Sequence, residues 1–107
     1  MESLRYDKTL SITIRDEKIK YGILYGNKKI VFIKVGADGN IRGYQDKYLR
    51  MAHRVHDRIG ATVICASNSD LSGKTQLKAD KTLIEKVIAY LGLDHYELYF
   101  IGNSDGG

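Results

Sequence analysis

The sequence predicts an α/β fold, with a mostly parallel sheet that begins with an antiparallel hairpin. Two apolar runs of strand length, "KIVFIKV" (Lys29–Val35) and "ATVICAS" (Ala61–Ser67), are typical of strands covered on both faces. Amphipathic segments with apolar residues three and four apart alternate with such runs, which indicates helical crossovers between parallel strands. We therefore expect a single domain over residues 1–107, in the order strand, strand, strand, helix, strand, helix, strand.

The first two strands are expected to pair as a hairpin at the edge of the sheet. "TLSITI" (Thr9–Ile14) alternates apolar and hydroxyl side chains, which is the period of a half-buried strand. A polar spacer, Arg15–Lys18, separates it from "IKYGILYG" (Ile19–Gly26). Gly26 and Asn27 then turn the chain into the buried run that starts at Lys29.

Two helices and a last strand complete the expected order. The first helix has apolar residues at helical spacing, namely Tyr44, Tyr48, Met51, Ala52, Val55 and Ile59. The second helix has such residues at Leu83, Ile84, Val87, Ile88 and Leu91. We expect Gly60 to end the first helix, and Asp80 and Gly92 to cap the start and the end of the second. "YELYFI" (Tyr96–Ile101) is the fifth strand.

The composition is that of a soluble globular protein, with 43% hydrophobic and 28% charged residues. No apolar run is long enough to span a bilayer, and no secretory leader opens the sequence, so we expect a cytoplasmic protein without a membrane partner. The single Cys65 cannot form an internal disulfide. Lysine and arginine are scattered among acids, with only Lys28 and Lys29 adjacent, so the net charge of +4 indicates solvated surface rather than a nucleic-acid partner.

The last strand leads into Gly102-Asn103-Ser104-Asp105-Gly106, which fits the pattern Gly-x-Ser-x-Gly. A sharp turn between a strand and a helix exposes the serine hydroxyl and aims the next backbone N–H at the developing oxyanion. Such a turn crowds the backbone, which explains the two glycines. The same five residues also fit an ordinary glycine-rich turn in which Ser104 is a turn-former. The local pattern leaves both interpretations open.

The run "DKTLIEKVIAYLGLDHYELYFIGNSDGG" (Asp80–Gly107) resembles the α/β-hydrolase fold superfamily, in which a helix, a short connection and an apolar strand precede a Gly-x-Ser-x-Gly-Gly turn. "KIVFIKVGADGN" (Lys29–Asn40) is similar to the family's third strand and oxyanion loop. "IGATVICASNSDLSGKT" (Ile59–Thr75) is similar to its fourth strand. The likeness extends over nearly the whole chain from Thr9, as the N-terminal portion of the fold ending at the nucleophile turn.

The resemblance implies that Ser104 is the nucleophile of a serine hydrolase acting on an ester, thioester, amide or other small carbonyl substrate. It implies oxyanion donors at the backbone N–H groups of Ala37 and Asp105, elbow glycines at Gly102 and Gly106, and neither a metal nor an organic cofactor. The chain departs from the family at Asn103, where histidine is commoner. Asp105 places a carboxylate beside the nucleophile, so we expect it to face away from the oxyanion.

The family's acid and histidine follow the nucleophile along the chain, and none follows Ser104 here. His53, His56 and His95 all precede it. His53 and His56 are three apart, a spacing that could hold a metal on one helical face, but no carboxylate or cysteine pattern supports a metal site, so we expect surface histidines. We therefore expect the base and the acid in polypeptide beyond this chain, and the chain alone to be inactive. An apolar fifth strand without cover predicts self-association or pairing with that missing C-terminal polypeptide.

Two alternatives are kept. Asn68–Thr75 matches a phosphate-binding loop except at its first glycine, so its backbone N–H groups and Lys74 could cradle a nucleotide's phosphates. The chain could also be a non-catalytic fragment or remnant of a hydrolase fold that serves as a binding or self-associating piece.

Overall fold

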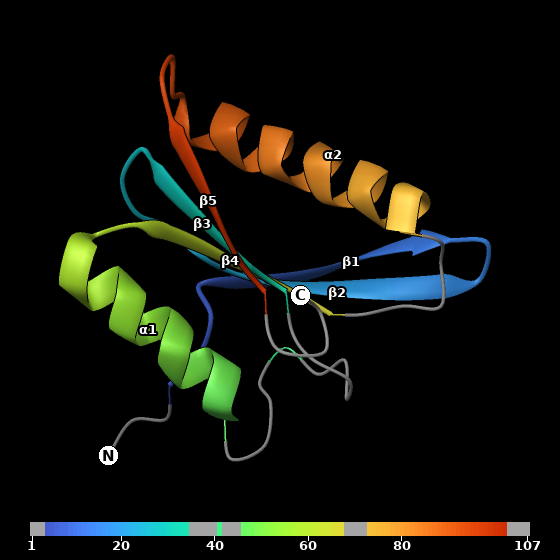
Figure 1. Ribbon diagram of the computed structural model, residues 1–107, viewed down its shortest axis with the longest axis horizontal. Coiled ribbons are helices and arrows are strands. Elements are labelled where there is room, and N and C mark those ends of the chain that lie inside the picture. The colour runs from blue at the N-terminus through green and yellow to red at the C-terminus, as the bar shows by residue number, and fades with distance from the viewer. Residues whose placement is uncertain (1–3, 35–40, 42–45, 68–72, 103–107) are drawn as a thin grey trace.

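The computed structural model describes residues 4–34, 41, 46–67 and 73–102, which contain five strands and two helices (Figure 1). Along the chain the elements are β1 (Lys8–Ile14), β2 (Glu17–Leu24), β3 (Lys29–Lys34), α1 (Lys47–Ile59), β4 (Thr62–Ala66), α2 (Gly73–Leu91) and β5 (Glu97–Gly102). Each of the five expected strands is present, with ends within two residues of the predicted ones. The α/β class is therefore confirmed.

The five strands form one mixed sheet in the lateral order β1-β2-β4-β3-β5, which differs from their order along the chain. β1 pairs with β2 and β2 pairs with β4 in antiparallel fashion, whereas β4 and β5 both flank β3 in parallel. The prediction of a mostly parallel sheet is therefore wrong, because half of the pairings are antiparallel. The apolar β2 inserts beside β4 and so contributes a second antiparallel pairing.

The hairpin that joins β1 and β2 forms as expected, and a two-residue turn closes it. Arg15 and Asp16 adopt φ angles of 51° and 68°, and Ile14 pairs with Glu17 across the turn. A positive φ at both central residues gives the backbone twist that matches two antiparallel strands. The turn thus fixes the register in which Leu10, Ile12 and Ile14 share one face of the sheet.

α1 and α2 cover opposite faces of the sheet (Figure 1), so the molecule has three layers and two cores. The core beneath α1 contains Tyr6, Leu24, Val31, Ile33, Ile41, Tyr48, Leu49, Ala52, Ala61, Val63 and Cys65. The core beneath α2 contains Ile19, Tyr21, Ile23, Ile30, Phe32, Ile64, Ala66, Ala79, Leu83, Ile84 and Val87. Alternate residues of β3 and β4 supply both cores, which explains why residues 30–33 and 63–66 are all apolar.

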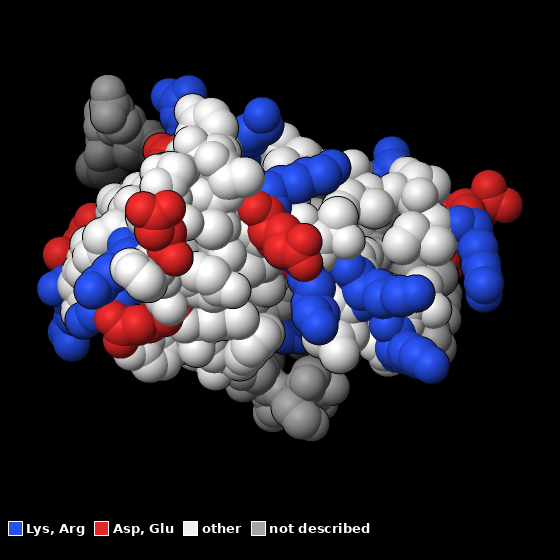
Figure 2. Space-filling model, turned by 90° about the horizontal axis from the view of Figure 1, so that it is seen from above, with Lys and Arg blue, Asp and Glu red and all other residues white. Residues whose placement is uncertain are grey.

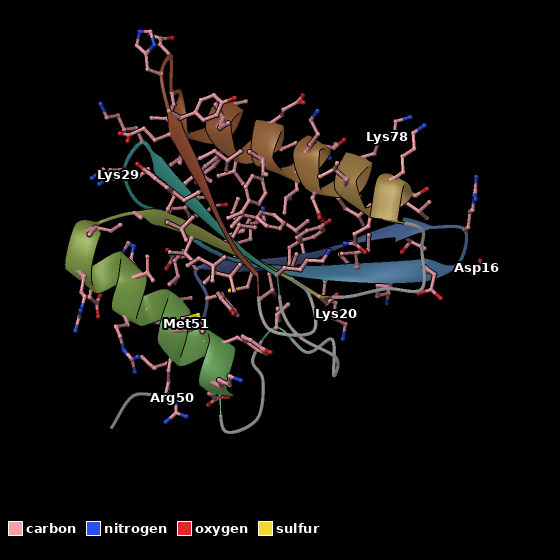
Figure 3. The ribbon with its side chains drawn as sticks, viewed as in Figure 1. Asp16, Lys20, Lys29, Arg50, Met51 and Lys78 are labelled. Carbon is pink, nitrogen blue, oxygen red and sulfur yellow. The ribbon has the colours of Figure 1, made fainter. Side chains whose placement is uncertain are left out.

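The outward faces of the helices are mostly polar, although Ile59 of α1 and Leu77 and Tyr90 of α2 are exposed. Arg50 of α1 and Lys78 of α2 point away from the sheet, whereas Met51 lies partly buried against the core of α1 (Figure 3). No helix in the described part of the chain has the length and apolar character needed to cross a membrane.

α2 begins at Gly73, which is seven residues earlier than the predicted cap at Asp80. Asp80 lies inside the helix and is 5% exposed, so the prediction that it caps the start is wrong. The buried positions Gln76, Ala79, Asp80 and Leu83 are three and four residues apart and continue the inward face of the helix toward its start. The predicted end is confirmed, since α2 stops before Gly92, whose φ is 67°.

Candidate functional site

The carboxyl ends of β3, β4 and β5 meet at one edge of the sheet, because the three strands are parallel (Figure 1). The register places Lys34, the last residue of β3, beside Gly102, the last residue of β5. It also places Lys34 beside Ala66, the last residue of β4. Three separate stretches of the sequence therefore leave the sheet side by side.

The connections that leave this edge diverge to opposite faces of the sheet. β3 is followed by α1 on one face, and its neighbour β4 is followed by α2 on the other. Where neighbouring parallel strands send their connections to opposite faces, a crevice opens outside their carboxyl ends, and open α/β sheets bind their ligands there. This edge is the candidate functional site of the fold.

Of the residues predicted from the nucleophile pattern, Gly102 is the one that the structure describes, and its backbone ends β5. Ser104, Asp105 and Gly106 lie outside the described residues, as does Ala37 of the expected oxyanion loop. Their roles stay predictions. The described residues do establish that the two segments carrying them leave the sheet from adjacent strands.

A buried carboxylate lies next to this edge, on α2. The Tyr21 hydroxyl of β2 donates a hydrogen bond to Asp80 Oδ1 at 2.7 Å, and Gln76 Nε2 donates to the same oxygen at 3.2 Å. Lys34 Nζ lies 3.4 Å from Asp80 Oδ2 and forms an ion pair with it. A carboxylate this deeply buried requires such partners, because removing a charge from water costs several kcal/mol when it is unpaired.

Burial is the main reason that the pKa of Tyr21 is raised well above its ordinary value of 10.0, and the hydrogen bond and charge of Asp80 raise it further. The phenol therefore stays protonated at neutral pH and donates to the carboxylate. The four residues Lys34, Asp80, Tyr21 and Gln76 tie the end of β3 and the middle of β2 to α2.

An open hollow of about 350 Å³ lies between α2 and the ends of β3 and β5. Its lining residues are Phe32, Lys34, Gly73, Gln76, Leu77, Asp80, Phe100 and Ile101. The rings of Phe32 and Phe100 are 5.7 Å apart and form an apolar floor, whereas Lys34, Gln76 and Asp80 supply polar groups on one side. Such a volume and such a mixture are typical of small-molecule sites.

Two of the three histidines contact backbone carbonyl oxygens away from this edge. His53 Nε2 lies 2.7 Å from the carbonyl oxygen of Arg5, and His56 Nδ1 lies 2.8 Å from that of Ala61. His95 is exposed and precedes β5, at the opposite end of the strand from Gly102. In the described part of the chain no three His, Cys, Asp or Glu side chains gather as they would around a metal ion.

The phosphate-loop alternative falls only partly on described residues. Gly73 and Lys74 form the exposed start of α2, whereas Asn68 and the residues up to Ser72 lie outside the described part.

Seen from the side of α2, acidic side chains lie among the basic ones on the surface (Figure 2). The expected absence of a nucleic-acid partner stays a prediction.

Sequence reasoning missed Lys34, Tyr21 and Gln76 as neighbours of a buried acid. One signal was present, because Gln76 and Asp80 are four residues apart and therefore share a helical face with the apolar Ala79 and Leu83. A carboxylate on an apolar helical face needs a partner from another element. The identity of that partner depends on the lateral strand order, which the sequence did not supply.

Comparison with known proteins does not place the chain in a family. No family model matches the chain, and no curated protein sequence is significantly similar to it.

Proposed function

We propose that the chain is the N-terminal portion of a serine hydrolase of the α/β-hydrolase type, with Ser104 as its nucleophile. The proposal is carried by the parallel pairing of β3 with β5, in which Lys34 lies beside Gly102. Neighbouring strands are about 4.8 Å apart, so the segments that follow them start within one strand spacing of each other. Ala37 comes three residues after Lys34, and Ser104 comes two residues after Gly102.

The crevice outside this edge, where the connections that follow β3 and β4 pass to opposite faces of the sheet, adds support. An acyl-transfer site needs a nucleophile and oxyanion donors that converge on one carbonyl group from different segments. In the proposed site the backbone N–H groups of Ala37 and Asp105 would hold the oxyanion. Gly102 and Gly106 would permit the tight turn that exposes the hydroxyl.

The reaction proceeds in two steps. The Ser104 hydroxyl loses its proton to a base while its oxygen attacks the substrate carbonyl, and the oxyanion collapses to an acyl-enzyme as the leaving group takes up that proton. Water then attacks the acyl-enzyme and gives a proton to the base. The base passes that proton to the Ser104 oxygen as the carboxylic acid product leaves. The base and its acid partner would lie in polypeptide beyond Gly107, so the 107-residue chain alone would be inactive.

The substrate class is a small ester, thioester or amide, and the compartment we expect is the cytoplasm. The hollow between α2 and the ends of β3 and β5 has room for the apolar part of such a substrate, with Phe32 and Phe100 as its floor. The mechanism uses no metal or organic cofactor.

A fluorophosphonate probe tests the proposal on the natural gene product, whose intact mass is measured first. The activated serine of a hydrolase displaces fluoride from the probe and keeps the phosphonyl group, which adds a fixed mass to one peptide. We expect a product longer than 107 residues that is labelled at Ser104. Ser104→Ala should lose at least 100-fold of the labelling rate.

Ser11→Ala is the matched control, because Ser11 is an exposed serine on β1 and should have no part in the reaction. Its labelling rate should equal that of the unchanged protein. A natural product that ends at Gly107 and refuses the probe, or one that is labelled equally in Ser104→Ala, would contradict the proposal.

A second candidate function is that of a non-catalytic, self-associating remnant of such a fold. The exposed apolar side chains of β5 favour it, because β5 pairs with β3 on one side alone within the described sheet, and an apolar edge strand invites pairing. Nucleotide binding through Asn68–Thr75 has no comparable support among the described residues.

A further inference from the structure

The hairpin of β1 and β2 is covered only in part by α2, and an open hollow of about 340 Å³ lies between them. We call this feature the hairpin hollow. Its floor is apolar and is formed by Leu10, Ile23, Leu83 and Val87. Leu83 and Val87 are four residues apart and therefore share one face of α2. The packing of the helix on the two strands fixes the shape of the hollow.

Two tyrosine rings also line the hairpin hollow. The ring centroids of Tyr25 and Tyr90 are 4.8 Å apart, and their planes are inclined by 34°. Tyr25 is half-buried, whereas Tyr90 is 72% exposed. Aromatic rings attract one another at centroid distances of about 4.5–7 Å. The exposed ring of Tyr90 can therefore pack against a further ring that belongs to a ligand.

The charged residues that line the hairpin hollow are two lysines, Lys8 of β1 and Lys86 of α2. Neither ammonium group pairs with a carboxylate of the described residues. The positions from which an acid would reach them are not acidic. Lys86 has Thr82 four residues before it and Tyr90 four residues after it, and Lys8 lies opposite Ile23. The two positive charges are thus available to an external anion.

The acids next to these lysines in the sequence do not neutralise the hollow. Asp7 Oδ2 accepts a hydrogen bond of 2.9 Å from the backbone N–H of Tyr25, so this carboxylate is held by the backbone. Glu85 directly precedes Lys86 on α2, and consecutive residues of a helix do not face each other. Neither acid is among the residues that line the hollow.

We propose that the hairpin hollow binds a small molecule that combines a flat aromatic ring with a carboxylate or phosphate group. The ring would lie on the apolar floor against Tyr90, and the anionic group would lie within reach of Lys8 and Lys86. A volume of about 300–1,000 Å³ is typical of small-molecule sites. Lysine binds an anion as a point charge, so the hollow suits either anionic group.

This binding site is separate from the proposed hydrolase site. β1 and β5 are opposite edges of the sheet, and the hairpin hollow is lined by β1, β2 and the second half of α2. No step of the inference uses Ser104 or the exposed side chains of β5. Its failure and the failure of the proposed hydrolase are therefore independent results.

The openness of the hollow sets the expected strength of binding. A ligand of about ten heavy atoms that stays partly in water gains little from burial, so we expect a dissociation constant on the order of 1 mM. Each lysine lies at the surface, where an ion pair is weak. The loss of one lysine should therefore raise the dissociation constant by about two- to fivefold.

Titration of the isotope-labelled natural gene product with phenyl phosphate, followed by amide chemical shifts, tests the inference. We expect saturable shifts that are concentrated in residues 8–10, 23–25 and 83–90. Benzyl alcohol has the ring without the charge, and inorganic phosphate has the charge without the ring, so each should bind several-fold more weakly. Benzoate in place of phenyl phosphate shows which anionic group the site prefers.

Substitutions assign the binding to the named side chains. Lys8→Gln and Lys86→Gln should each weaken phenyl phosphate and leave benzyl alcohol unchanged, whereas Tyr90→Ala should weaken both. All three residues are exposed, so the variants should fold. Lys78→Gln is the matched control, because Lys78 points away from the sheet (Figure 3) and should have no effect. Ser104→Ala should bind phenyl phosphate normally.

Three results would overturn the inference. The first is the absence of saturable shifts up to about 20 mM phenyl phosphate. The second is a set of shifts centred on the ends of β3 and β5 instead of the hairpin hollow. The third is a Lys78→Gln variant that weakens binding as much as Lys8→Gln and Lys86→Gln, which would mean that the probe responds only to the overall charge.

Discussion

At the scale of single residues, burial decides which polar groups matter in this fold. Tyr21 and Asp80 come from β2 and α2, and each satisfies the other beneath the helix. Neither residue stands out in the sequence, because a tyrosine in an apolar run and an aspartate near a helix start are both ordinary. The prediction that Asp80 caps α2 was wrong for this reason. An aspartate that caps a helix and a buried aspartate inside a helix look alike in the sequence, and only the position at which the helix begins distinguishes them.

Cys65 on β4 leads to a prediction about stability and pH. Its thiol is fully buried, and burial raises its pKa from 9.0 to about 11, although a hydrogen bond with Tyr6 acts in the opposite direction. Because the pKa of the thiol is higher in the folded protein, the unfolded chain ionises first as the pH rises. The contribution of the neutral thiol to the free energy of unfolding is therefore complete below pH 9.0 and is lost as the pH rises toward 11. We expect the thiol to account for a fall of about 2–3 kcal/mol in the free energy of unfolding.

Urea denaturation between pH 8 and pH 11, in the presence of a reductant, measures this fall. Tyr21 titrates in the same direction, so the contribution of the thiol is the difference between the unchanged protein and Cys65→Ala. The variant should show a shallower decline above pH 9. Equal slopes for the two proteins would mean that the buried thiol does not control stability there.

At the scale of elements, local signals predicted boundaries well where glycine or a polar turn marks them. Gly60 and Gly92 end α1 and α2 as expected, and both have φ angles of 67°. The end of α2 shows why, because Gly92 N–H donates to the carbonyl of Ala89 and Leu93 N–H donates to that of Ile88. This pair of hydrogen bonds requires a left-handed residue after the helix.

Gly92→Ala should therefore lower the free energy of unfolding by about 1 kcal/mol. A Cβ at Gly92 would meet no atom within 4 Å, so the cost is that of the positive φ alone. Gly73→Ala at the start of α2 is the matched control, since its Cβ would also meet nothing and its φ is not positive. It should change stability by less than about 0.5 kcal/mol. Equal effects of both substitutions in thermal or urea denaturation would contradict this explanation.

The sequence could not supply the neighbours of each strand. β2 is nearly all apolar toward its end, and such a strand fits beside any other buried strand. Its place between β1 and β4 makes the sheet mixed, and that place depends on contacts between residues more than 35 positions apart in the sequence. The candidate site was predictable to the extent that Gly102 ends β5, whereas Lys34 and Asp80 meet only because of the tertiary arrangement.

At the scale of the whole molecule, one sheet separates two cores. Ile33 faces the core of α1 and Ile19 faces the core of α2, and both side chains are fully buried. Removing one methylene from each should cost about 0.5–1.5 kcal/mol. Since no packing partner is shared across the sheet, we expect the costs of Ile33→Val and Ile19→Val to add to within about 0.5 kcal/mol.

A double-mutant cycle by urea denaturation measures this additivity. Ile30→Val combined with Ile19→Val is the comparison, because both residues belong to the core of α2 and can relax together. A coupling of more than about 1 kcal/mol between Ile33 and Ile19 would mean that the sheet transmits repacking from one core to the other.

The pairing of β3 with β5 also bears on how the chain acquires its structure during synthesis. Lys29 pairs with Glu97, which comes 68 positions later, and both helices and β4 lie between them. While the ribosome is still making α2, β3 has a partner on one side only, so one flank of the sheet's centre stays open. The parallel pairing of β3 with β5 must wait for β5 to emerge, and loop closure over so long a span is slow. A nascent chain of this protein should therefore rely on chaperones most during the interval between the release of β3 and the arrival of β5.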